Sequence, residues 1–217
     1  MAGPSVSILD YGVGNLRSVA RAFEVCGAAP ILASSPKEAA RAERLVIPGV
    51  GAFGSCVAAI RKRGFHETIE EVVRLRQRPV MGICVGMQML LDESEEFGPV
   101  TGFGYLPGGV VGLAKELGET RRKVPHVGWA ALIPPEENVE RWNGTPLEGV
   151  RPGDEVYFVH SFHAAPANRQ HYLAGADYLG DSVCAAVHHE NLVGFQFHPE
   201  KSGPVGLAIL RRFLEMG

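Results

Sequence analysis

The sequence predicts an α/β fold in which a mixed, mostly parallel open sheet carries helices on both of its faces. Short β-branched runs alternate with amphipathic segments through the first part of the chain, which is typical of βαβ units. From about residue 100 glycine and proline become denser and short alternating runs follow one another, which favours strands, some of them antiparallel. No internal repeat or low-complexity linker divides the sequence, so residues 1–217 are expected to form a single domain.

The elements of the first half are expected in regular alternation. The first helix is the best marked, because Asn15 can cap its amino end, Gly27 can stop it and its apolar residues recur at helical spacing. Those apolar residues are Leu16, Val19, Ala20 and Phe23. Strands are predicted over 6–9, 30–33, 44–49 and 79–83, and further helices over 34–43, 53–64 and 85–97. In the last helix Met87, Leu90 and Leu91 can face the core while the acidic end stays solvated.

The second half is predicted to be richer in strands. They are expected over 108–114, 123–132, 155–162, 172–178, 182–189 and 192–197, and a helix over 203–216 closes the domain.

Charge and composition exclude several classes of partner. Lysine and arginine total 21 against 24 acidic residues, a net charge of −3, so we expect no nucleic acid or anionic membrane as partner. The start of the sequence lacks the pattern of a secretory signal, and every apolar run is too short to span a bilayer. The four scattered cysteines form neither a C-x-x-C pair nor a dense disulfide framework, which favours reduced thiols in a cytoplasmic protein.

A glycine-rich segment, PGVGAFG at 48–54, contains the G-x-G-x-x-G pattern of dinucleotide-binding sites. The acidic residues about 20 positions further on, Glu70 and Glu71, fall in a helical pattern rather than at a strand end, which argues against a nucleotide. The glycines have a second possible use, because backbone that approaches a ligand closely can offer N–H groups to a developing anion.

Cys84 lies between two glycines in GICVG, at the end of a predicted strand. This G-x-nucleophile-x-G pattern is typical of a tight strand-to-helix turn that lifts a nucleophile out of a sheet. The start of the next helix would also favour the thiolate, through its dipole and its unpaired N–H groups. The alternative is a small buried apolar residue, which is how we interpret Cys26, Cys56 and Cys184.

A nucleophilic cysteine needs a base and a group that orients the base. His198 ends the apolar run LVGFQF, and Glu200 follows two residues later, so both are expected at the carboxyl end of the sheet with Cys84. In extended backbone residues i and i+2 point the same way, so Glu200 can reach the far nitrogen of His198. The other histidines are interpreted as structural or surface residues. No H-x-x-x-H or H-E-x-x-H spacing occurs, which argues against a metal site.

Together these residues resemble the class I (triad) glutamine amidotransferases. PVMGICVGMQ is similar to the nucleophile signature of this family, and GFQFHPEKS to the segment that carries its base and acid. Within the family, GMQ after the nucleophile and PHVGW at 125–129 resemble the glutaminase subunits of imidazole glycerol phosphate synthases. DYGVGNLRSV near the start, the glycine loop and ESEE at 93–96 agree with this branch. The resemblance runs from about residue 5 to the end of the sequence.

The resemblance implies roles for further residues. Cys84 would attack the side-chain amide of L-glutamine, His198 would move the proton and Glu200 would stabilise the imidazolium. Backbone N–H groups at Val50, Gly51 and Val85 would stabilise the oxyanion. Gln88 and Glu96 would hold the amino-acid end of glutamine, with backbone contacts from Ser161 and Phe162. For Glu96 a solvated helix end is the alternative. Trp129, Tyr157 and Lys201 would contact a synthase subunit, although Trp129 could equally belong to the core.

The implied reaction releases glutamate and ammonia without a cofactor. Ammonia would pass to a (βα)8-barrel synthase subunit, which makes imidazole glycerol phosphate and AICAR in histidine biosynthesis. The resemblance also implies low activity in the isolated subunit, with a movable glycine loop completed by the partner.

Several other functions stay open at this stage. A Cys-His-Glu hydrolase could act on peptides or γ-glutamyl conjugates, because a triad does not disclose its acyl substrate. The glutaminase of pyridoxal phosphate synthase is a second candidate, against which the histidine-branch segments argue. A nucleotide-binding or scaffolding module built on the 48–54 loop would be non-catalytic, and Cys84→Ala would then leave its activity intact.

Overall fold

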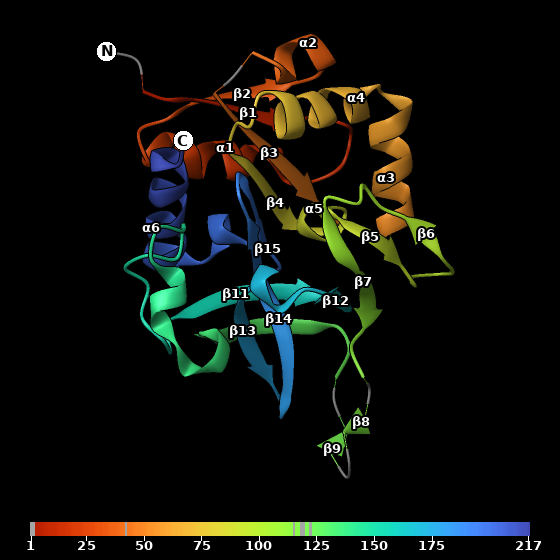
Figure 1. The fold of residues 1–217 in the computed structure, drawn as a ribbon, viewed down its shortest axis with the longest axis vertical. Coiled ribbons are helices and arrows are strands. Elements are labelled where there is room, and N and C mark those ends of the chain that lie inside the picture. The colour runs from red at the N-terminus through yellow and green to blue at the C-terminus, as the bar shows by residue number, and fades with distance from the viewer. Residues whose placement is uncertain (1–2, 42, 115, 118–119, 122) are drawn as a thin grey trace.

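A computed structural model of the chain describes residues 3–41, 43–114, 116–117, 120–121 and 123–217 (Figure 1). One block of five strands is parallel, in the order β2-β1-β3-β4-β15. Its members are β1 (Ser5–Leu9), β2 (Ala29–Ala33), β3 (Arg44–Gly49), β4 (Val80–Cys84) and β15 (Leu192–Phe195). Successive residues of β3, Leu45 to Ile47, are all buried, so both faces of this block are covered.

The helices that cover the parallel block are short. They are α1 (Leu16–Val25), α2 (Pro36–Ala39), α3 (Phe53–Lys62), α4 (Phe65–Glu70), α5 (Val85–Gln88) and α6 (Gly203–Glu215), and a π-helical turn, Glu71–Leu75, extends α4. Helices α1 and α6 pack together through Phe23 and Phe213, whose ring centroids are 6.1 Å apart (Figure 1). No helix in the described part of the chain is long and apolar enough to cross a membrane.

The second half of the sheet is mainly antiparallel. From β15 the sheet continues in the order β14-β12-β7-β5-β6, and β13 connects β14 to the β10-β11 pair. These strands are β5 (Leu91–Ser94), β6 (Val100–Thr101), β7 (Leu106–Gly112), β10 (His126–Ile133), β11 (Glu155–His160), β12 (Phe162–Pro166), β13 (Tyr172–Tyr178) and β14 (Asp181–His189). A small hairpin of β8 (Glu116–Leu117) and β9 (Thr120–Arg121) projects from the body of the molecule (Figure 1).

Most predicted elements are confirmed. The first helix begins after Asn15, whose side chain accepts a hydrogen bond from the Ser18 backbone N–H, and Gly27 follows its end with φ +88°. The strand predicted over 155–162 is instead two strands, because the chain bends at Ser161. There it leaves the pairing of β11 with β10 and enters the pairing of β12 with β7 and β14.

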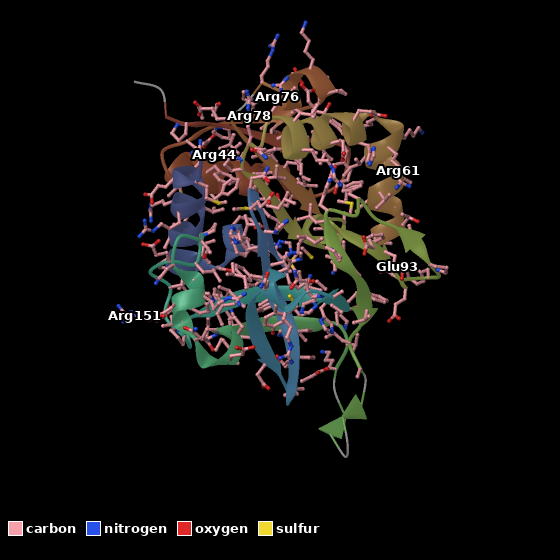
Figure 2. All side chains as sticks on the ribbon, in the orientation of Figure 1. Arg44, Arg61, Arg76, Arg78, Glu93 and Arg151 are labelled. Atoms are coloured by element: carbon pink, nitrogen blue, oxygen red, sulfur yellow. The ribbon has the colours of Figure 1, made fainter. Side chains whose placement is uncertain are left out.

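The helix predicted over 85–97 is wrong beyond residue 88. Residues 91–94 form β5, which pairs with β7 and β6. Met87, Met89, Leu90 and Leu91 are all fully buried, so this run has no exposed helical face and strand pairing prevails over helix propensity. Asp92, Glu93 and Glu95 are nevertheless exposed, as expected for the acidic end, and Glu93 points away from the molecule (Figure 2).

Candidate active site

Cys84 lies at a strained turn between β4 and α5. Its backbone has φ 55° and ψ −112°, a conformation that costs a residue other than glycine roughly 1–3 kcal/mol. The glycines on either side are required by packing, since a Cβ on Gly86 would lie 1.8 Å from the carbonyl oxygen of Ile47. A Cβ on Gly82 would lie 2.6 Å from the carbonyl oxygen of Gly86. The chain therefore has the tight strand-to-helix turn that the sequence pattern indicated.

His198 and Glu200 form a buried pair near this turn. Nδ1 of His198 lies 2.8 Å from Oε1 of Glu200, and the two side chains are 3% and 2% exposed. The route to this contact differs from the expectation. The strand predicted over 192–197 ends at Phe195, and residues Pro199–Lys201 form a 3-10 turn. The turn brings the carboxylate back to the imidazole, so strand alternation is not the cause.

The backbone of His198 is held by β11. Its N–H donates to the carbonyl oxygen of Tyr157 at 2.9 Å. The hydroxyl of Ser202 donates to the carbonyl oxygen of His198 at 2.7 Å and accepts from the N–H of Tyr157 at 3.0 Å. Ser202 is buried and joins the turn that carries His198 and Glu200 to β11, and the sequence pattern did not indicate it.

The environment of His198 favours the charged imidazole. Burial lowers its pKa, but the Cys84 thiol and the Glu200 carboxylate outweigh burial and raise the pKa to about 9. Nε2 of His198 is buried and has no hydrogen-bond partner of standard geometry among the described residues. The Cys84 thiol is nevertheless close enough to raise the pKa of His198. Nε2 is therefore the nitrogen that can exchange a proton with Cys84, and the charged imidazole corresponds to the proton on His198.

Two further groups contact the sulfur of Cys84. The thiol donates to the carbonyl oxygen of Val159, at an Sγ–O distance of 3.8 Å, and Nε2 of Gln196 lies 3.6 Å from Sγ. Neither was predicted. Gln196 has a signal in the sequence, since it is the single polar residue of the apolar run LVGFQF. Val159 contributes only its backbone, for which a sequence pattern gives no signal.

Gln88 faces the same interior, as its one-turn spacing from Cys84 predicted. Its Nε2 donates to the carbonyl oxygen of Phe162 at 2.8 Å and to Oε1 of Gln196 at 3.0 Å. The carbonyl oxygen of Ser161 accepts from the N–H of Leu113 at 2.8 Å. The carbonyls of Ser161 and Phe162 therefore already have partners within the protein.

The glycine loop begins beside the nucleophile, because Gly49 is the register partner of Cys84 in the β3-β4 pair. A Cβ on Gly49 would lie 2.5 Å from the backbone nitrogen of Gly86, so the loop runs directly against the start of α5, where Val85 is the first residue. Val50 and Gly51 follow, and Gly51 has φ +89°. The three residues predicted to stabilise the oxyanion are thus grouped around the end of β4.

Neighbouring side chains hold this loop. The thiol of Cys56 donates to the carbonyl oxygen of Val50, and the hydroxyl of Tyr11 donates to that of Pro48. Oε2 of Glu96 accepts from the N–H of Phe53, the first residue of α3, at 2.6 Å. Glu96 therefore caps a helix start after the loop, and the solvated helix end considered as its alternative is wrong.

The three predicted interface residues lie together on the surface. The rings of Trp129 and Tyr157 face each other across β10 and β11, with centroids 5.9 Å apart. Nζ of Lys201 lies 5.9 Å from the centroid of Tyr157. Trp129 is 52% exposed, so it does not belong to the core, and Val127 beside it on β10 is 57% exposed.

A cavity of about 730 Å³ opens elsewhere, within the antiparallel half. It is lined by residues of β12, β13 and β14, among them His163, Tyr172 and Ser182, and the predicted catalytic residues do not line it. No group of three or more histidine, cysteine or acidic side chains within the described ranges is arranged to hold a metal ion.

The model of the family described as glutamine amidotransferase class-I matches residues 7–216. The chain belongs to the class I glutamine amidotransferase family. The predicted fold class is confirmed as well, because the chain superposes on class I amidotransferase structures. One described as a crystal structure of glutamine amidotransferase has a TM-score of 0.70 at 19% identity and covers 97% of each chain.

Curated relatives of this class I amidotransferase carry a more specific name. "Imidazole glycerol phosphate synthase subunit HisH 1" of Legionella pneumophila (strain Lens) is 46% identical over 98% of this chain and 99% of the relative. The HisH subunit of Geobacter sulfurreducens is 43% identical over 97% of this chain and 98% of its own length. The structure of PurLQS from Thermotoga maritima shares the fold, with a TM-score of 0.72, 21% identity and 98% coverage of each chain.

Proposed function

We propose that residues 1–217 form one glutaminase domain, the glutaminase subunit of an imidazole glycerol phosphate synthase in histidine biosynthesis. The observation that carries this proposal is the buried arrangement of Cys84, His198 and Glu200 in a class I amidotransferase. The names of the relatives that match nearly the whole chain support the choice of branch.

The first chemical step is attack of the Cys84 sulfur on the side-chain amide carbon of L-glutamine. Before the attack, His198 takes the thiol proton at Nε2, which leaves a thiolate beside an imidazolium, and the imidazolium then gives this proton to the departing ammonia. Glu200 holds the Nδ1 proton and stabilises the imidazolium. A pKa of about 9 at His198 favours this charged form near neutral pH. Water then hydrolyses the thioester, with His198 as base, and glutamate is released.

The backbone around the nucleophile supplies the oxyanion site. The N–H groups of Val85, at the start of α5, and of Val50 or Gly51 in the glycine loop are the proposed donors, and loss of one such donor costs about 10²–10³ in rate. Gln88 keeps Oε1 for the substrate, because its Nε2 is used by Phe162 and Gln196. Glu96 is the second proposed contact for the amino-acid end of glutamine. Its carboxylate is held near the glycine loop by the hydrogen bond from the N–H of Phe53.

A synthase subunit with a (βα)8 barrel is the proposed partner. It receives the ammonia and makes imidazole glycerol phosphate and AICAR. The surface patch of Val127, Trp129 and Lys201 around the half-buried Tyr157 is its proposed docking surface. The carbonyl oxygen of Tyr157 accepts the N–H of His198, so a partner that contacts Tyr157 would touch the residue that holds the backbone of the proposed base. We place this assembly in the cytoplasm.

Glutamate release by the full chain tests the proposal. Purified protein is assayed with free L-glutamine, alone and with the synthase subunit and its nucleotide ligand, and Cys84→Ala is the control. We expect turnover of glutamine that requires Cys84 and rises when the liganded synthase is present, because the partner completes the glycine loop. Equal rates with and without the partner would reject gating. Turnover of γ-glutamyl peptides in place of glutamine would reject the amidotransferase proposal itself.

A further inference from the structure

Gln196 is a fully buried polar residue between two buried aromatic residues, Phe195 and Phe197. A buried amide is costly unless its donors and acceptor have partners. Its Oε1 accepts from Nε2 of Gln88 at 3.0 Å, and its own Nε2 lies 3.6 Å from the sulfur of Cys84. The second contact reaches the reacting atom of the site, and the reaction as proposed above does not use it.

The orientation of the Gln196 amide follows from its neighbours, taken in order. The carbonyl oxygen of Phe162 can only accept, so the group of Gln88 that faces it must be the amide nitrogen. The second N–H of that nitrogen then donates to Gln196, so the accepting atom of Gln196 must be Oε1. Nε2 of Gln196 is therefore the group that faces the sulfur, because turning the amide over would set two donors against each other.

A pair of buried histidines holds the carbonyl of Phe162, at which this series of hydrogen bonds begins. Nδ1 of His160 lies 3.0 Å from the carbonyl oxygen of Phe162, and Nε2 of His160 lies 3.1 Å from Nδ1 of His126. Burial lowers the pKa of His160 to about 3 and that of His126 to about 4, so both rings are neutral. Each then has one N–H: Nδ1–H of His160 donates to the carbonyl oxygen of Phe162, and Nδ1–H of His126 donates to Nε2 of His160. Four residues, His126, His160, Phe162 and Gln88, thus hold Gln196 in one orientation.

The two contacts of the sulfur favour opposite protonation states. The carbonyl of Val159 can only accept, so it favours the thiol, whereas the N–H of Gln196 can only donate, so it favours the thiolate. The titratable groups near Cys84 among the described residues are His198, Tyr11 and Cys56. Burial raises the pKa of Tyr11 and of Cys56, so both stay neutral and leave His198 as the charged neighbour.

We propose that Gln196 donates a hydrogen bond to the Cys84 sulfur and stabilises the thiolate from which the reaction starts, with Gln88 and Phe162 holding its amide in the donating orientation. This role rests on the proposed glutaminase function, because it assigns Gln196 to the same nucleophile. It adds a catalytic contact that is supplied by a side chain outside the Cys84, His198 and Glu200 set.

The test is the pH dependence of Cys84 alkylation by iodoacetamide in the isolated full chain. The modified residue is mapped by peptide mass, so that Cys26, Cys56 and Cys184 are counted separately. Gln196→Met keeps the length of the side chain and removes the donor. We expect the pKa for alkylation of Cys84 to rise by about one unit, which is a roughly tenfold smaller thiolate fraction at a given pH below it. The readout is the difference between variant and wild type measured under the same conditions.

Two further variants complete the experiment. Gln170→Met is the matched control, since Gln170 is exposed and distant in the fold, and it should leave the alkylation profile unchanged. Gln196→Asn keeps a buried amide but shortens it, and it should shift the pKa in the same direction as Gln196→Met; it also replaces that variant if Gln196→Met fails to fold. Melting temperature is measured for each protein.

An unchanged alkylation pKa in the folded Gln196 variants would overturn the inference, even if glutamate release falls, because a purely structural role lowers activity without moving this pKa. Failure of the proposed function is distinguishable, since the wild-type chain would then release no glutamate from L-glutamine, whereas the alkylation pKa of Cys84 would still report on Gln196.

Discussion

In the antiparallel half of the molecule burial lowers the pKa of five imidazoles, whereas at the carboxyl end of the parallel block the pKa of His198 is raised to about 9. The five are His126, His160, His163, His171 and His188. All six lose hydration, so burial does not separate the two regions. The difference comes from the Glu200 carboxylate, 2.8 Å from His198, and from the Cys84 thiol. The partners of a histidine, and not its burial, therefore distinguish a candidate base from a structural ring.

The two regions also contribute to the site in different ways. The parallel block supplies side chains at strand ends, such as Cys84 after β4 and His198 after β15. The antiparallel half supplies backbone, since the carbonyls of Tyr157, Val159 and Phe162 bind His198, Cys84 and Gln88 respectively. Side-chain chemistry is therefore concentrated at one edge of the sheet, and the other half positions it.

The strongest test of this comparison exchanges one cysteine in each region for alanine. Cys84→Ala should lower glutaminase activity by about 10⁴-fold or more, because the nucleophile is lost. Cys184→Ala, in the buried β14, should leave activity unchanged and lower the free energy of unfolding by about 1 kcal/mol. Glutamate release and urea unfolding measure the two effects.

A variant at the strained position sharpens the same test. Cys84→Gly should be inactive but more stable than Cys84→Ala by about 1 kcal/mol, because glycine adopts φ 55° without strain. The comparison of regions would be wrong if activity were lost equally on replacing Cys84 and Cys184.

Glycine replacements test how tightly each region packs its backbone. Gly86→Ala should lower the free energy of unfolding by about 3 kcal/mol, because its Cβ would lie 1.8 Å from the carbonyl oxygen of Ile47. Gly109→Ala in β7 is the control, since its Cβ would meet its nearest atom at 3.8 Å, and its cost should be below about 1 kcal/mol. Equal destabilisation of the two variants in urea would contradict close packing at the nucleophile turn.

The proposed docking patch belongs to the antiparallel half. Trp129→Ala should weaken binding of the synthase subunit by about 2 kcal/mol, as for an aromatic anchor at an interface. Because Trp129 is 52% exposed, unfolding should change by less than about 1 kcal/mol. Leu75→Ala is the control on the other region, where the side chain is 80% exposed and binding should not change. Titration calorimetry measures the affinity of each variant for the synthase subunit. An unaltered affinity for Trp129→Ala would show that this patch is not part of the interface.

Acid should weaken the antiparallel half first. The folded pKa values of His126 and His160 lie below the usual 6.5, so between pH 6.5 and about 4 the unfolded chain binds protons that the folded chain does not. Stability present above pH 6.5 is then lost as pH falls, by up to about 1.4 kcal/mol per pH unit for each ring. His198 has the opposite sign, because its raised pKa adds stability below pH 6.5 that is lost as pH rises through about 9.

Urea unfolding at several pH values between 7 and 5 measures the acid effect. His126→Phe keeps a ring between Phe158 and Tyr178 and should reduce the slope by up to one proton, about 1.4 kcal/mol per pH unit. An identical slope in this variant would mean that His126 is protonated in the folded chain.

Much of the parallel block could be predicted from the sequence. Its central strands, such as β3, are apolar runs buried on both faces, and its first helix has a cap, an apolar stripe and a glycine stop, all of which are local signals. The turn at Cys84 was predictable for the same reason, since two glycines at fixed spacing are a steric requirement. The helix expected over 85–97 was not, because β5 forms only through pairing with β7 and β6.

The βαβ alternation, the family resemblance and the candidates Cys84, His198 and Glu200 could all be read from the residue order, because each depends on residue types at short spacing. The folded chain was needed to show that a 3-10 turn brings Glu200 to His198, that Ser202 joins this turn to β11, and that Gln196 faces the sulfur. These contacts join segments far apart in the chain, several through backbone atoms that every residue carries. Their partners are fixed by packing and not by local pattern.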